Sequence, residues 1–134
     1  MIVIDDLPFS LKGKGETLLI IDDEPSFVEV TKILLEISGY QVLGAKNGLE
    51  GIEVFKNHSD AIDVIICDLH MPVLGGSEAI NKILEIEPAI KVILISGSIE
   101  KNDIPPILIP GRIEFLNKPF HTETLLTTLR TLLK

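Results

Sequence analysis

The chain contains 134 residues, of which 46% are hydrophobic, and carries a formal net charge of −8 at pH 7. This length suits one domain with a buried core, and the acidic balance argues against direct binding to nucleic acid or to an anionic membrane, because both need clustered Lys and Arg. The single cysteine, Cys67, excludes an internal disulfide. With no signal-peptide pattern and no apolar run of membrane-spanning length, the sequence predicts a cytoplasmic protein.

Residues 1–16, including the acid pair Asp5 and Asp6, are predicted to be a leader or linker, and residues 17–134 to form one domain. Within that domain, five short segments rich in Ile, Leu and Val are predicted strands: 17–21, 41–45, 63–67, 91–96 and 113–117. Most are apolar on both faces, which is typical of parallel strands that are covered on both sides.

Helical patterns follow most of these strands. They cover residues 26–38, 47–57, 77–87 and 122–133, and the first carries a stripe at helical spacing formed by Phe27, Val30, Leu34 and Ile37. Asn47 and Glu50 form a capping-box pattern at the start of the second helix. The fourth connection differs, because it contains Pro105 and Pro106 and a proline inside a helix costs about 3 kcal/mol. We expect a short helix near residues 100–104 and then an irregular apolar stretch.

Alternating strands and helices with short connections predict an α/β fold, in which a doubly wound five-stranded parallel sheet has helices on both faces. The strand order is either 2-1-3-4-5 or that of a truncated nucleotide-binding sheet. In both cases, ligands bind beyond the carboxyl ends of the strands. Polar residues follow four of the predicted strands: Asp22, Asp23 and Glu24, then Asp68, then Ser96, and finally Lys118 with Pro119. The order 2-1-3-4-5 brings the acids together at its switch point and is therefore favoured.

This set of side chains has a recognisable chemistry. Carboxylates about 4 Å apart repel one another by a few kcal/mol even at an effective dielectric near 20. A divalent cation relieves the repulsion, and an all-oxygen site that is open to water suits Mg²⁺. A metal beside the ammonium of Lys118 and the hydroxyl of Ser96 is suited to phosphoryl transfer, with Asp68 as the nucleophile.

Four motifs in this order, IIDDEP, CDLHMPVLGG, LISGS and FLNKPF, resemble the receiver domain of two-component response regulators, which has a flavodoxin-like fold. The resemblance extends over residues 17–133. It implies that Asp68 accepts a phosphoryl group from the phosphohistidine of a sensor histidine kinase or a histidine phosphotransfer protein. It also implies a Mg²⁺ site in which Asp23 and Asp68 are direct ligands, Asp22 acts largely through water and the backbone carbonyl of His70 completes the set.

The resemblance assigns further roles at the ends of the last two strands. Ser96 would hydrogen-bond the phosphoryl group, Lys118 would pair with it, and the Lys118–Pro119 peptide is expected to be cis. Ser96 and Phe115 correspond to the pair of switch residues of the family. Phosphorylation would then alter a partner-binding face made by the expected fourth helix, strand 113–117 and the last helix, and a homodimer through this face is left open.

Other interpretations remain beside this one. A single Asp at position 22 or 23 would be a helix cap and Ser96 an ordinary turn residue, but their combination with Asp68 and Lys118 favours a site. An aspartate-nucleophile phosphatase is disfavoured, because His70 stands where such enzymes carry a second acid. A receiver fold that no longer cycles, acting only as an interaction module, is the main alternative.

The predicted protein is mainly a signalling switch, although it would catalyse its own phosphorylation and dephosphorylation. The ring of His70 is expected to face solvent, where we hypothesise that it tunes the lifetime of the aspartyl phosphate. The segment GKGETLL resembles the junction in front of receivers that follow a sensor kinase core, so the chain is interpreted as a receiver from a hybrid sensor kinase or a stand-alone regulator.

Overall fold

The computed structural model describes residues 8–71, 73–97 and 108–134. Five strands, β1 (Thr17–Ile21), β2 (Gln41–Ala45), β3 (Ile62–Asp68), β4 (Lys91–Ser96) and β5 (Ile113–Asn117), form one sheet in the order β2-β1-β3-β4-β5. All neighbouring strands are parallel. The predicted doubly wound sheet of order 2-1-3-4-5 is confirmed, and the truncated nucleotide-binding sheet is not the fold.

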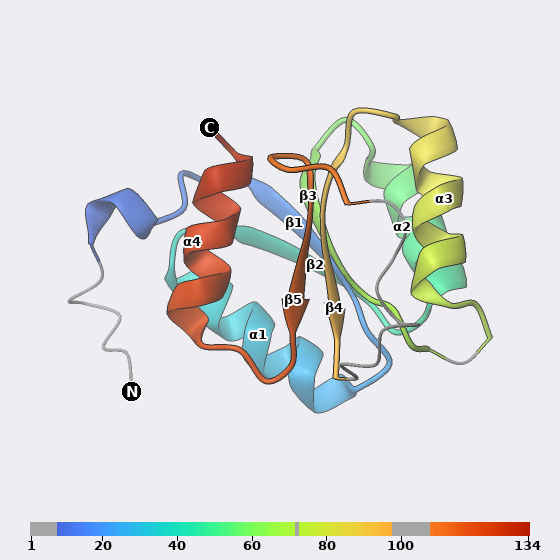
Figure 1. Ribbon diagram of the computed structural model, residues 1–134, viewed down its shortest axis with the longest axis horizontal. Coiled ribbons are helices and arrows are strands. Elements are labelled where there is room, and N and C mark those ends of the chain that lie inside the picture. Colours follow the sequence, from blue (N-terminus) through green and yellow to red (C-terminus); the bar gives the residue numbers. More distant parts are fainter. Residues whose placement is uncertain (1–7, 72, 98–107) are drawn as a thin grey trace.

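Helices cover both faces of the sheet. They are α1 (Pro25–Ile37), α2 (Gly48–His58), α3 (Gly76–Ile86) and α4 (Thr122–Leu132), and a short 3-10 helix, η2 (Phe9–Leu11), precedes β1. Figure 1 shows α1 and α4 on one side of the sheet and α2 and α3 on the other. The helix expected near residues 100–104 falls outside the described residues. None of the described helices has both the length and the apolar character that crossing a bilayer requires.

The core consists of two apolar clusters separated by the sheet. Along β1, Leu19 and Ile21 belong to the cluster under α2 and α3, whereas Leu18 and Ile20 belong to the cluster under α1 and α4. All four side chains are fully buried. Because successive residues of a strand point to opposite faces, a strand between two layers of helices needs apolar residues on both faces, as residues 18–21 of β1 provide.

Helix α1 has apolar residues on two sides. Its buried positions are Thr31 and Leu35, whereas Val30 and Ile37, two members of the predicted stripe, are 57% and 58% exposed. Ile33 is also exposed, at 51%. Two sets of residues in this helix share helical spacing, so periodicity alone does not identify the set that faces the sheet.

The residues just before β1 pack against the amino-terminal edge of the sheet. Leu11 contacts the cluster under α1 and α4, and the backbone N–H groups of Gly13 and Gly15 donate to the carbonyls of Ser38 and Gly39, at 2.7 and 2.9 Å. Gly13 lies so close to Gly39 that a Cβ at either position would meet the other's backbone. The described part of the predicted linker is thus held near the amino-terminal ends of the strands, away from their carboxyl ends.

Candidate functional site

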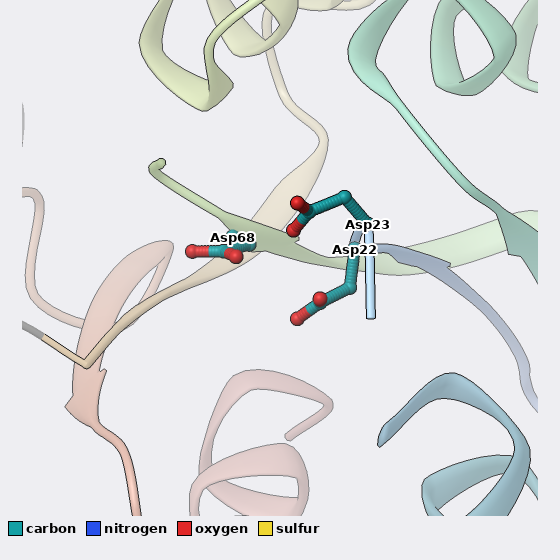
Figure 2. Close-up of side chains that lie close together, drawn as sticks. All are labelled: Asp22, Asp23 and Asp68. Carbon is teal, nitrogen blue, oxygen red and sulfur yellow. The ribbon is translucent and has the colours of Figure 1, made fainter. Parts of the chain in front are cut away.

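Three aspartates meet at the carboxyl ends of β1 and β3. These strands are neighbours, and Ile21 of β1 lies opposite Cys67 of β3, so Asp22 and Asp23 follow β1 where Asp68 ends β3. Figure 2 shows the side chains of Asp22 and Asp23 directed toward Asp68. One carboxylate oxygen from each of the three lies within 4.8 Å of the others. The predicted convergence of these acids is present in the structure.

Asp22 is fully buried and is held in place by hydrogen bonds. Its Oδ1 accepts from the backbone N–H of Glu24 at 2.9 Å, and its Oδ2 lies 2.7 Å from the Nζ of Lys118. The first of these bonds closes a turn just before α1, because Glu24 is the residue that precedes the helix. Asp22 therefore joins the start of α1 to the end of β5.

Lys118 is the positive group of the site. It follows β5, its backbone N–H donates to the carbonyl of Ser96 at 2.7 Å, and the Lys118–Pro119 peptide is cis. Its Nζ lies 2.7 Å from Asp22 and 3.8 Å from Asp68. Burial alone would lower the pKa of this ammonium, but the hydrogen bond to Asp22 and the charges of Asp22 and Asp68 outweigh burial and raise the pKa of Lys118.

Asp68 lies in an environment that disfavours its charge. It is only 5% exposed, and burial raises the pKa of its carboxyl above the ordinary value. The backbone N–H of His70, which donates to Asp68 Oδ1 at 3.2 Å, lowers the pKa, the charge of Asp22 raises it, and Lys118 lowers it. Three carboxylates and one close ammonium leave this crevice with excess negative charge, and the atoms that could bind a metal are all oxygens. Such a donor set fits a hard divalent cation such as Mg²⁺.

Ser96 and Phe115 lie on the two strands beyond β3. Ile95 of β4 pairs with Asp68 in the sheet, so Ser96, which is fully buried, is the next residue toward the site. Phe115 of β5 is partly buried and packs against the cluster under α2 and α3. Both residues therefore lie on strands that lead to the crevice, as the sequence predicts, while the ring of Phe115 contacts the core.

Several contacts of the site were not predicted from the sequence. The Nζ of Lys118 lies over the ring of Phe27, 4.1 Å from its centroid, and 3.3 Å from Glu24 Oε1. Gly76, the first residue of α3, lies so close to Asp68 that a Cβ would overlap the Asp68 carbonyl oxygen, and Val73, in the loop between β3 and α3, has a positive φ of 74°. The pair Gly75–Gly76 in the sequence is a weak signal for such a close approach. No sequence pattern near Phe27 predicts its contact with Lys118, which is distant in the chain.

The chain was compared with known proteins. The response regulator receiver domain family matches residues 18–130. The chemotaxis protein CheY of Thermotoga maritima is 30% identical over 121 residues, covering 90% of this chain and 99% of that protein. The sensor kinase CckA of Brucella abortus is 27% identical over an alignment of 140 positions, which covers 97% of this chain but 15% of that kinase.

Solved structures agree with these relatives. A response regulator receiver domain protein from Clostridium thermocellum superimposes with a TM-score of 0.80 at 32% identity, covering 87% of this chain and 94% of that one. The receiver domain of the hybrid histidine kinase CckA superimposes with a TM-score of 0.74 at 28% identity, covering 88% and 99%. The match over residues 18–130, the strand order and the acidic crevice lead to one conclusion: the chain belongs to the response regulator receiver domain family of two-component signalling.

Proposed function

We propose that this receiver is a phosphoryl-accepting switch in which Asp68 takes a phosphoryl group from a phosphohistidine donor. The observation that carries the proposal is the position of Lys118, whose Nζ lies between Asp22 and Asp68 at 2.7 and 3.8 Å. A buried carboxylate beside two other acids and one ammonium is arranged to bind a dianionic group together with a cation. The donor would be a sensor histidine kinase or a histidine phosphotransfer protein.

In this proposal the metal is Mg²⁺, and Asp22, Asp23, Asp68 and the backbone carbonyl of His70 would hold it. When bound, it supplies positive charge that neutralises the phosphoryl oxygens during transfer. The support is the chemistry of the donors: the three carboxylate oxygens lie within 4.8 Å of one another, and Lys118 is the one cation shown to pair with them among the described residues.

Different residues of the chain would carry out the separate parts of phosphoryl transfer. A carboxylate oxygen of Asp68 attacks the phosphorus in line and forms a P–O bond, while the P–N bond to the donor imidazole breaks and its electron pair stays on the ring nitrogen. Lys118 and the Ser96 hydroxyl stabilise the charge on the transferred group. Attack by water on the same phosphorus later releases inorganic phosphate and restores the Asp68 carboxylate.

For the partner, we propose docking on the exposed apolar side of α1. Val30, Ile33 and Ile37 are 57%, 51% and 58% exposed, and α1 begins directly after the acids of the site. A partner that covers this stripe would place its phosphohistidine near the crevice, and an apolar patch beside a functional site is typical of a protein interface. Homodimerisation through this surface is the competing outcome.

We propose that residues 1–16 are a linker whose described part lies where it is compatible with access of a donor to the crevice. Its described part, residues 8–16, lies at the amino-terminal edge of the sheet, whereas the crevice lies at the carboxyl-terminal edge. The chain spans 15% of CckA and 51% of the probable transcriptional regulatory protein TcrX of Mycobacterium tuberculosis. A domain attached through this segment would leave the phosphoryl site open.

The test is labelling with acetyl phosphate and Mg²⁺, followed by intact-mass analysis. We expect a stable gain of one phosphoryl group in the wild type and none in Asp68→Asn or in EDTA. Absence of any adduct would favour the non-cycling interaction module instead, and rapid release of phosphate without an accumulating adduct would favour a phosphatase.

Docking is tested separately with a purified phosphohistidine donor. Ile33→Ser should be labelled by acetyl phosphate as fast as the wild type but should accept the phosphoryl group from the protein donor more slowly. Equal transfer rates from the protein donor would place docking elsewhere. Analytical ultracentrifugation of the wild type beside Ile33→Ser then reports whether the same stripe joins two copies of the chain.

A further inference from the structure

The ammonium of Lys118 contacts two groups besides the aspartates of the site, Glu24 and the ring of Phe27. Its Nζ lies 2.7 Å from Asp22, 3.3 Å from Glu24 and 4.1 Å from the centroid of the Phe27 ring, whereas Asp68 is 3.8 Å away. The resting lysine is therefore closer to Asp22 and Glu24 than to Asp68. Since the proposed transfer needs this cation at a group carried by Asp68, whatever holds it in its resting place affects the transfer.

Phe27 provides an aromatic surface beneath the ammonium. Its ring packs against the core cluster under α1 and α4 and meets the ring of Phe120 edge to face, with centroids 6.1 Å apart and an interplanar angle of 88°. Phe120 follows Lys118 by two residues, so the lysine and the ring that supports Phe27 belong to one short segment. A cation over an aromatic face is attracted within about 6 Å of the ring centroid, and the ammonium lies 4.1 Å from it, so a small shift toward Asp68 would keep this attraction.

Glu24 is the second carboxylate that contacts this ammonium. Its side chain is 61% exposed at the rim of the crevice, and it is the N-terminal boundary residue of α1, yet it makes no capping hydrogen bond. Instead it pairs with Lys118 at 3.3 Å. A carboxylate in this position competes with a phosphoryl group for the same ammonium.

We propose that Phe27 and Glu24 are positioning residues that act on Lys118 in opposite directions: the Phe27 ring retains the ammonium in the crevice, and Glu24 draws it away from Asp68. The inference rests on the proposed phosphoryl-accepting function of Asp68 and adds two residues that regulate it. Loss of the ring should weaken the bound phosphoryl state, and loss of the Glu24 charge should strengthen it.

The test measures binding of beryllofluoride, an inorganic mimic of the phosphoryl group, at saturating Mg²⁺ by fluorine NMR. Phe27→Leu should weaken binding about three- to tenfold, the range of one cation–π contact, while Phe27→Tyr, which keeps the ring, should restore it. Glu24→Gln should tighten binding about two- to fivefold, the range of an exposed ion pair. Glu29→Gln, the same change at an exposed position of α1, is the matched control and should have no effect.

The same substitutions in a variant without the Lys118 ammonium distinguish positioning of that ammonium from general structural effects. In Lys118→Met, both Phe27→Leu and Glu24→Gln should leave beryllofluoride binding unchanged, because they act through the ammonium. Effects that persist in this background overturn the inference, as do single variants that bind like the wild type. Failure of the wild type itself to bind beryllofluoride overturns the proposed function and this inference with it. Binding by the wild type without the expected differences among the variants overturns this inference alone. Urea denaturation and a separate Mg²⁺ titration establish that each variant is folded and binds the metal.

Discussion

Replacing Asp68 by Asn is expected to stabilise the metal-free protein at neutral pH. Asp68 is buried, and its carboxylate lies within 4.8 Å of oxygens of both Asp22 and Asp23. Burial raises the pKa of Asp68, and the charge of Asp22 adds to this effect. Asn keeps an acceptor for the backbone N–H of His70 but carries no charge. The substitution therefore removes a penalty and retains the hydrogen bond.

The distances give the magnitude. A repulsion at 4.8 Å amounts to about 3.5 kcal/mol at an effective dielectric of about 20, and the attraction of Lys118 at 3.8 Å amounts to about 4 kcal/mol. Two repulsions thus exceed one attraction by about 3 kcal/mol. Because Asp23 is the most accessible of the three acids and water screens its charge, we expect a net gain of about 2 kcal/mol, or about 5 °C in Tm for a domain of this size.

The gain should depend on pH in a defined direction. A folded-state pKa above the ordinary value of 3.8 means that the penalty is absent below that value and grows as the pH rises through the folded pKa. The advantage of Asp68→Asn is therefore full at pH 7.5 and shrinks toward pH 4. Urea denaturation in EDTA, followed by far-UV circular dichroism, measures it, and Asp60→Asn at an exposed position is the matched control.

Added Mg²⁺ should reduce the stability advantage of Asp68→Asn over the wild type. A cation that binds only the folded wild type stabilises it by mass action, and Asp68→Asn should gain less because a ligand charge is missing. If Asp68→Asn is no more stable than the wild type at pH 7.5 in EDTA, while Asp60→Asn is unchanged, the electrostatic reasoning is refuted.

Three further predictions concern stability, measured by urea or thermal denaturation. Glu16→Gln should cost about 1 kcal/mol, because Glu16 accepts a hydrogen bond from Arg130 at 2.7 Å. Although burial raises the pKa of Glu16, hydrogen bonds from a backbone N–H and Arg130 lower it overall, so the cost is full above the ordinary value of 4.5 and disappears as the pH falls through the lowered pKa. Val73→Gly should stabilise by about 1 kcal/mol, since a β-branched residue at a φ of 74° is strained; no gain would mean that the loop has adapted. Gly76→Ala should destabilise by about 2 kcal/mol or more, whereas Gly75→Ala, where a Cβ makes only an ordinary contact, serves as its control.

The strands of this fold could be predicted closely from the sequence. Four of the five predicted strands have the bounds seen in the structure, and β3 is one residue longer at each end than predicted. The reason is physical: each strand is a short segment rich in apolar residues, and β1, β3 and β4 are almost entirely buried, so polar residues mark the point where each buried run ends. The same boundary identified Asp22, Asp68 and Lys118, because charges directly after buried strands must gather at one edge of a parallel sheet.

Contacts between distant segments could not be predicted in this way. The exposed stripe of α1 has the same spacing as its buried side, so only the packing of the helix shows that Thr31 and Leu35 face inward. The ring of Phe27 under Lys118 depends on the orientation of α1 relative to β5. Likewise, residues 8–16 show no strong pattern, and their place beside Gly39 follows from a fit between two glycines.

The packing of the core also determines the geometry of the site. Ile21 and Cys67 lie opposite each other in the sheet and belong to the same apolar cluster. A shift of one residue between β1 and β3 would turn one of these side chains to the other face and remove it from its cluster. Asp22 follows Ile21 and Asp68 follows Cys67, so the register that buries the apolar pair also aligns the two acids. The core therefore stabilises an arrangement of carboxylates that is unfavourable by itself, and the strong pairing of β1 with β3 keeps these acids together when no cation is bound.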